Sequence, residues 1–461
     1  MRRSLALSAL VLLASAPAWG FEYRGITFYF TNETIYQYNK LSDVQDEYFN
    51  STSLFVKYGQ WSGGLTFRGF NYYKQDPNNA LTHGELELYR KYVQFDSEHV
   101  DVTCGDFYAM LGRGATLSVL QNDKAFRERT ILGVDVQVQT KHLRFRGLAG
   151  RVKDELQSQA WKVYGGEAIV NIAKDHRVGL HVSRIEDDEP FMFMGPRNTG
   201  TVSAEGGNIL GMFSYYVEAG KMEFDNVFLD DGTGVYGNVG FNRKNVSVTF
   251  EVKRYKSFDN GLNNPPSADR PDEAAYMIDS ESAMLHCQYA FFSPDVVLQF
   301  NVGRLKEFGI PGHEIYGGVS AEDLWEKMNV SAVYGVKRLS YPIRRWDASY
   351  LYRFTDRLSA EFTFRDKRYT VYTYKFGETD CAWQLSLSPY GSAFFNYQHS
   401  AQPVMDRNHF YSGGIRVNIR EGAYAEAMAG TVRGGEVCSS GQCFYMPPFK
   451  GLKVSLYVTL R

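Results

Sequence analysis

The sequence predicts an all-β chain that closes into an antiparallel transmembrane β-barrel. Three observations predict it: an export signal, a composition rich in tyrosine, phenylalanine and glycine, and strand-type alternation along the whole chain. The 461 residues include 32 Tyr, 32 Phe and 43 Gly but only 14 Pro, and the chain is polar on average. A barrel with a wet lumen and aromatic belts at the two membrane interfaces requires this composition. The formal net charge of −2 gives no reason to expect a nucleic-acid partner.

The N-terminus has the organisation of a secretory signal peptide. Arg2 and Arg3 precede an apolar stretch, Leu5–Ala14. Ala18 and Gly20 are the small residues that a signal peptidase requires for cleavage before Phe21, and Ala16 and Ala18 offer an alternative site two residues upstream. The stretch is too short to span a bilayer as a helix, which takes about 20 residues. We therefore expect a signal peptide at 1–20 and a mature barrel at 21–461.

Alternation of apolar and polar residues is the main evidence for strands. In the last ten residues, Leu452, Val454, Leu456, Val458 and Leu460 alternate with Lys453, Ser455, Tyr457, Thr459 and Arg461. The same period recurs at 134–139, 246–253, 296–303, 360–365 and 415–420. Successive side chains of a strand point to opposite faces, so each segment has one apolar face and one polar face. Strands can satisfy their backbone hydrogen bonds in lipid only within a closed sheet.

The number of strands follows from the length of the chain. Two strands of about 11 residues, one short turn and one longer loop take about 50 residues, which predicts about 18 strands, within a range of about 16–20. Longer polar connections at 187–206, 257–275, 306–326 and 433–448 are expected to be extracellular loops. Within the third of these, Ser320–Trp325 has a capping-box pattern that predicts a short helix.

Charged residues in phase with the polar faces are expected to line the lumen, because Arg or Lys facing lipid costs about 2–4 kcal/mol at the bilayer midplane. The residues selected in this way are Arg68, Arg144, Arg146, Glu251, Lys253, Arg353, Glu361, Arg365, Arg416 and Arg420. Eight of them are basic and two are acidic, so the lumen is expected to favour anionic solutes.

One segment departs from the alternating pattern. Gly112-Arg113-Gly114 interrupts a strand with two residues that tolerate positive φ, and the residues that follow, up to Thr130, alternate poorly. Residues 112–130 therefore fold either into the lumen or outward as a loop that begins with a tight turn. In the inward arrangement Asp106, Arg113 and Arg127 are the candidates for a pore constriction.

The same segment carries a family resemblance. Gly105-Asp106-Phe107-Tyr108, Gly112-Arg113-Gly114 and Leu117 are followed by Leu132-Gly133. This pattern resembles a segment of an uncharacterised family of bacterial outer-membrane β-barrel proteins, in which Arg often stands where this chain has Leu132. The resemblance covers about 35 residues and implies a porin-like barrel in the bacterial envelope. It brings no substrate and no catalytic residue.

The cysteines and histidines indicate no cofactor. Cys438 and Cys443 enclose four residues of a loop, which predicts a local disulfide in an oxidising compartment, whereas the pairing of Cys104, Cys287 and Cys381 cannot be read from the sequence. The nine histidines show no metal-ligand spacing. His181-Val182-Ser183 resembles the His-x-Ser of outer-membrane phospholipase A, but Arg184-Ile185 replaces the expected Asn-Gly, so two ordinary lumen-facing residues are expected.

Three hypotheses for the function remain. The first is an outer-membrane porin-like channel, in contact with outer-membrane lipid, that passes small and preferentially anionic solutes without enzymatic activity. The second is a non-enzymatic scaffold or sheath around an envelope partner, such as an electron-carrier protein. The third and most remote is a barrel enzyme that acts on lipid. The sequence leaves the oligomeric state open.

Overall fold

The computed structural model describes residues 22–460 with several internal gaps. The gaps are 42–45, 71–85, 121–128, 155–160, 188–194, 226–229, 267–278, 293–294, 308, 339–341, 372–373, 405–406, 440–441 and 447. The expected signal peptide at 1–20 and the constriction candidate Arg127 lie outside the described residues. None of the helices within the described part is long and apolar enough to cross a membrane.

Strands make up almost all of the described chain. The first part comprises β1 (Glu22–Tyr23), β2 (Ile26–Asn39), β3 (Asp46–Tyr58), β4 (Trp61–Phe70), β5 (Leu86–Asp96), β6 (Val100–Phe107), β7 (Ala109–Leu111), the 3-10 helix η1 (Gly112–Gly114), β8 (Leu117–Val119), β9 (Arg129–Gln139), β10 (Leu143–Asp154), β11 (Trp161–Ala173), β12 (His176–Asp187), β13 (Arg197–Ile209), β14 (Phe213–Phe224) and β15 (Gly232–Arg243). The second part comprises β16 (Val246–Lys256), β17 (Asp279–Phe292), β18 (Asp295–Glu307), β19 (Ile310–Leu324), β20 (Met328–Arg338), β21 (Pro342–Arg353), β22 (Leu358–Val371), β23 (Tyr374–Leu387), β24 (Gly391–Val404), β25 (Arg407–Arg420), β26 (Ala423–Val432), β27 (Gly435–Ser439), β28 (Gln442–Met446) and β29 (Phe449–Leu460).

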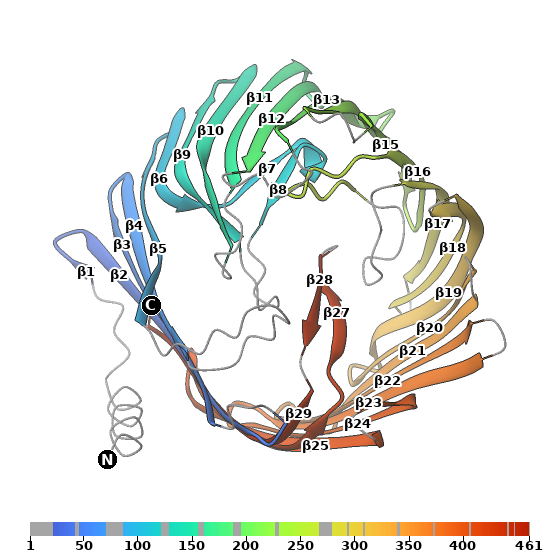
Figure 1. Cartoon of the computed structure of the whole chain (residues 1–461). Coiled ribbons are helices and arrows are strands. Elements are labelled where there is room, and N and C mark those ends of the chain that lie inside the picture. Colours follow the sequence, from blue (N-terminus) through green and yellow to red (C-terminus); the bar gives the residue numbers. More distant parts are fainter. Residues whose placement is uncertain are drawn as a thin grey trace.

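The long strands form one sheet that closes on itself. Each pairs antiparallel with the next wall strand along the chain, and β29 pairs with both β26 and β2, with Phe30 opposite Leu460 and Asn39 opposite Gly451. Figure 1 shows the resulting ring of strands around a lumen. Because the ring has no free edge, every wall strand is hydrogen-bonded on both sides, as lipid requires. The structure thus confirms the all-β, closed antiparallel barrel.

The predicted number of about 18 strands is wrong. The sheet has 25 strands among the described residues, and one of them, the two-residue β1, pairs only with β2, so the wall has 24. The prediction allowed too many residues for each hairpin. Turns such as 59–60, 174–175 and 244–245 are only two residues long, which leaves residues for additional strands.

Two of the added strands lie where extracellular loops were expected. β13 crosses 187–206 and β19 crosses 306–326, and both contain small or polar residues in place of the apolar alternation that marks the other strands. The helix expected at Ser320–Trp325 is also wrong, because Val296 pairs with Ala321 and holds that segment in β19. Pairing with the neighbouring strands therefore overrides the local capping signal.

The outward face of the wall is apolar. On β9, Val134, Val136 and Val138 are exposed, whereas Asp135 between them forms an ion pair with Arg146 of β10. Arg146 also donates hydrogen bonds to the backbone carbonyls of Tyr108 and Met110, which belong to a segment inside the ring. The polar face is therefore the lumenal one, and the exposed valines face outward, as the lipid-facing side chains of a barrel do.

This assignment of faces predicts unequal effects for two neighbouring substitutions. Val136→Arg places a charge on the outward face and is expected to destabilise the barrel by about 2–4 kcal/mol and to reduce assembly. Gln137→Arg places the same side chain in the lumen, opposite Asp101, and is expected to assemble like the wild type. The heat-modifiable fraction on gels measures assembly. Equal fractions for the two variants would contradict the assignment.

The cysteines are only partly described. Cys104, Cys287 and Cys381 are free thiols. Cys438 and Cys443 stand directly opposite each other in the β27–β28 hairpin, but their side chains lie outside the described part, so the disulfide stays a prediction. Figure 1 shows this hairpin projecting inside the ring.

Candidate functional site: a shelf inside the barrel

A short hairpin lies inside the barrel between two wall strands. The chain leaves β6 after Phe107 and rejoins the wall in β9 at Arg129. In between, β7 and β8 pair with Ala109 opposite Val119 and Leu111 opposite Leu117. Figure 1 shows both strands within the ring. Of the two arrangements that the sequence left open, residues 109–119 have the inward one, whereas 121–128 lie outside the described residues.

The turn of the hairpin depends on its two glycines. Gly112, Arg113 and Gly114 all have positive φ, at 57°, 41° and 90°. A Cβ added to Gly112 would lie 2.1 Å from the Glu218 carboxylate on the wall, so a larger residue would push the turn off the wall. The pattern Gly-Arg-Gly therefore lets the backbone approach the wall closely while one arginine side chain remains at the turn.

A second segment, distant in sequence, extends the hairpin. This segment comprises residues 258–264, which follow β16. The backbone N–H of Ser118 donates to the carbonyl of Leu262 over 2.7 Å, and the backbone N–H of Asn264 donates to the carbonyl of Gly114 over 2.8 Å. The fully buried Asn260 side chain donates to the Thr116 carbonyl and to the Thr199 hydroxyl, both at 3.0 Å. We call residues 109–119 and 258–264 together the shelf.

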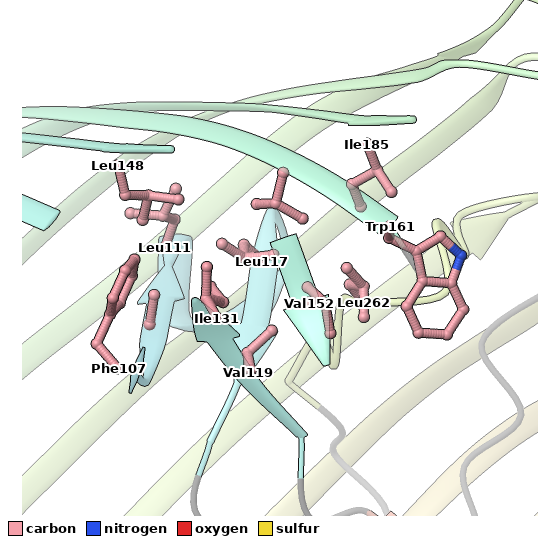
Figure 2. Close-up of a cluster of buried hydrophobic side chains, with 12 residues drawn as sticks. Phe107, Leu111, Leu117, Val119, Ile131, Leu148, Val152, Trp161, Ile185 and Leu262 are labelled. Atoms are coloured by element: carbon pink, nitrogen blue, oxygen red, sulfur yellow. The ribbon is translucent and has the colours of Figure 1, made fainter. Parts of the chain in front are cut away.

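Apolar packing fixes the shelf against the wall. Leu111 and Leu117 have no exposed surface, and neither do Ile131, Val163 and Ile185 of the wall strands that they meet. Figure 2 shows the shelf leucines and the wall isoleucines in one cluster. Each fully buried leucine contributes about 1.5–3 kcal/mol, so the shelf is held in place by the same kind of packing that holds a protein core.

Buried hydrogen bonds give the packing a single register. The Thr116 hydroxyl lies 2.8 Å from that of Thr201, which donates to Glu218 over 2.7 Å. Tyr216 also donates to Glu218, and Ser183 donates to the Thr116 carbonyl over 3.0 Å. These groups are buried, so an altered register would leave polar atoms without partners.

Arg113 projects from the shelf turn towards the lumen. Its guanidinium stacks over the Tyr216 ring, 3.6 Å from the ring centroid, and lies 3.2 Å from Glu205. Arg177 of β12 pairs with the same carboxylate. The two arginine side chains are 47% and 50% exposed, whereas Glu205 is 18% exposed. The turn therefore holds two guanidinium groups and two carboxylates, Glu205 and the buried Glu218, and the guanidinium groups are the ones exposed to the lumen.

The other two constriction candidates do not join Arg113. Asp106 is fully buried at the end of β6 and accepts a hydrogen bond from the backbone N–H of Lys91 over 2.8 Å. It is therefore part of the wall, where it stabilises the point at which the chain turns inward. Arg127 lies outside the described residues.

Half of the ten lumenal charges expected from the sequence are found in ion pairs with acidic side chains of the described part of the chain. Arg144 pairs with Glu167 and Arg146 with Asp135, each at 2.8 Å. Arg365, Arg416 and Arg353 pair with Asp347, Glu426 and Asp323 at 3.0, 2.6 and 2.6 Å.

The remaining candidates have other surroundings. Arg68 stacks over Tyr89, and Glu251 accepts hydrogen bonds from Tyr236 and His286. Lys253 is buried and Glu361 is exposed, while Arg420 ends β25 opposite Ala423.

The acidic partners reduce the excess of positive charge that the eight basic and two acidic candidates had suggested. Asp135, Glu167, Asp347 and Glu426 share the lumenal phase with their arginines but were not selected from the sequence. Their signal was present, because each lies in the same alternating pattern as its partner. In three of the four pairs the guanidinium is the more exposed group, for example 35% against 6% for Arg144 and Glu167, while Arg146 and Asp135 are equally exposed. In these three pairs the arginine lies over its carboxylate, whereas Arg197, Arg345 and Arg353 are less exposed than the carboxylates that they pair with.

No cluster of metal ligands occurs among the described residues. His181 and Ser183 share one face of β12 but have separate partners. The His181 ring lies between Glu167 of β11 and Ser203 of β13, while Ser183 binds the shelf.

Comparison with known proteins identifies a family. The chain belongs to a family of unknown function (DUF6029), whose model matches residues 23–276. Among solved structures, an E. coli P pilus tip assembly intermediate, PapC-PapD-PapK-PapG, is similar with a TM-score of 0.54 and 8% identity, over 96% of this chain and 62% of that one. The P pilus usher (PapC) translocation pore has a TM-score of 0.46 and 9% identity, over 95% and 99% of the two chains. OccAB4 of Acinetobacter baumannii has a TM-score of 0.46 and 10% identity, over 83% and 100%. At these identities a likeness concerns the fold alone. Curated proteins gave no match.

Proposed function

We propose that this protein is a channel of the bacterial outer membrane that passes small solutes and favours anions. The observation that carries the proposal is the shelf: a closed wall of 24 strands has a segment packed against its inner face with an arginine at its turn. Barrels of 16–18 strands already enclose aqueous channels, so a wall of this size needs inward elements to restrict what passes.

The preference for anions is supported by the exposure of three arginines at the shelf and beside it. Counting charges alone gives little preference, because nearly every lumenal arginine named above has an acidic partner. A passing solute, however, meets the exposed guanidinium groups first, at Arg113, Arg177 and Arg144, and the carboxylates lie behind them. Coulomb energy falls with distance and is screened by water, so the nearer charge dominates the field that the solute experiences.

A planar bilayer measurement tests the proposal. The purified mature barrel should give discrete conductance steps, and the reversal potential in a salt gradient should show that chloride permeates better than potassium. Heat-modifiable migration of the same sample verifies that the barrel is assembled. If an assembled sample gives no steps, the channel is excluded and the scaffold for an envelope partner becomes the better hypothesis. Steps with a preference for cations would overturn only the selectivity.

A further inference from the structure

Three lumenal side chains on adjacent wall strands form a hydrogen-bonded line. His181 of β12 has its Nδ1 atom 2.9 Å from an oxygen of Glu167 on β11, and its Nε2 atom 2.9 Å from the hydroxyl of Ser203 on β13. His181 is 3% exposed, and the other two residues are each 8% exposed. All three share the face on which Ser183 and Thr201 hold the shelf, so the line lies in the lumen beside it.

The order of the three groups is the one that activates a serine. A carboxylate on Nδ1 holds that nitrogen as the donor and leaves Nε2 to accept the hydroxyl proton, and it stabilises the imidazolium that then forms. The Glu167 carboxylate is itself held by Arg144 at 2.8 Å. The base and the group that orients it are therefore fixed before a substrate arrives.

A glycine leaves space where the histidine and the serine meet. Gly179 stands directly opposite Ser203. A Cβ at this position would lie 2.7 Å from both the Nε2 atom of His181 and the hydroxyl oxygen of Ser203. Any side chain here would separate the pair, so the glycine allows the ring to reach the hydroxyl.

Two guanidinium groups are held on the same face of β13 as the serine. Glu205 follows Ser203 by two residues on the same face of β13 and is paired with both Arg113 and Arg177. A cationic group near a reacting carbonyl stabilises the negative charge that develops on its oxygen. The half-exposed guanidinium groups also mark the side from which a solute can approach.

A second lumenal histidine shows what is specific to this line. His286 also binds a glutamate, with its Nε2 atom 3.2 Å from Glu251, but its other nitrogen meets the side chain of Asn301. That histidine has a carboxylate partner and no hydroxyl to activate. It is a natural internal control for His181.

We propose that Ser203 is an activated nucleophile that hydrolyses carboxylic esters entering the lumen, an activity additional to the channel. The Ser203 oxygen would attack the ester carbonyl carbon while His181 takes the hydroxyl proton. The carbon–oxygen bond to the alcohol then breaks, and the alcohol leaves with the proton from His181. Water, with one proton taken by His181, then attacks the acyl carbon. The bond from that carbon to the Ser203 oxygen breaks, the serine regains its proton from His181, and the carboxylic acid is released. No oxidant or cofactor takes part.

The test uses a fluorophosphonate probe, which forms a stable bond with activated serines, on the assembled barrel in detergent. Mass spectrometry should find one labelled peptide, and the labelled residue should be Ser203. Ser203→Ala should abolish labelling, and His181→Asn should slow it by about 10²–10⁴-fold, the usual contribution of a general base. Glu167→Gln keeps the shape of the side chain and should slow labelling less. If His181→Asn fails to assemble, the labelling rate of Glu167→Gln decides whether Ser203 is activated.

Matched controls separate activation from mere exposure. Ser349→Ala removes a lumenal serine whose hydroxyl partner is Ser331, and His286→Asn removes the other paired histidine. Both variants should be labelled at the wild-type rate. An unlabelled wild type, label on another residue, or equal rates for Glu167→Gln and the wild type would each overturn the proposal.

Discussion

Removal of the shelf hairpin should raise single-channel conductance several-fold. Replacing 109–119 by a short glycine–serine linker opens the side of the lumen that the hairpin occupies, while β6 and β9 keep their direct pairing from Val100 to Phe107. The wall should still close, because none of its strand pairs includes a shelf residue. Planar bilayer recordings at fixed salt measure the change.

A point substitution tests the same idea with a smaller perturbation. Leu117 has no exposed surface, so Leu117→Asp places a charge in the apolar cluster and should detach the hairpin from the wall. Leu120, at the end of the same segment, is 39% exposed, and Leu120→Asp should leave conductance unchanged. If neither the replacement nor Leu117→Asp alters conductance, the shelf does not restrict the pore.

The sequence predicted the fold because lipid permits few solutions. Residues such as Val134, Val136 and Val138 alternate with polar ones, and that period is sufficient to assign strands and faces. It was insufficient to count the strands. β13 alternates mainly among glycine, threonine, serine and alanine, so its identity as a strand comes from its neighbours β12 and β14.

Only one part of the shelf was predictable from the sequence, the turn that a short motif forms. Gly112-Arg113-Gly114 indicated a turn of unusual conformation, although its direction depended on the apolar packing of Leu111 and Leu117 against wall strands β9–β12. No local pattern links this motif to 258–264, because that contact spans more than a hundred residues. The partner of His181 was likewise missed, since Ser203 joins it through strand register and Ser183, its neighbour in sequence, faces the shelf.

Reversing the charge of Arg113 should shift selectivity towards cations. At about 10 Å and an effective dielectric constant of about 40, one unit charge changes the energy of a monovalent ion by about 0.8 kcal/mol. Arg113→Glu changes the site by two units, about 1.6 kcal/mol for each ion and opposite in sign for chloride and potassium. The permeability ratio of chloride to potassium therefore changes by about 3.2 kcal/mol, roughly 200-fold. The reversal potential in a potassium chloride gradient measures this ratio.

The control must be a lumenal arginine away from the shelf. Arg416 is similarly exposed, at 44%, and pairs with Glu426 on the part of the ring that Figure 1 shows opposite β7. Arg416→Glu makes the same change in net charge but at a site away from the shelf turn, and salt screens the field of that charge over a Debye length of about 8–10 Å. We therefore expect a much smaller shift than for Arg113→Glu. Equal shifts in the two variants would mean that total lumenal charge sets selectivity, and that the arginine at the shelf turn has no special position in the pore.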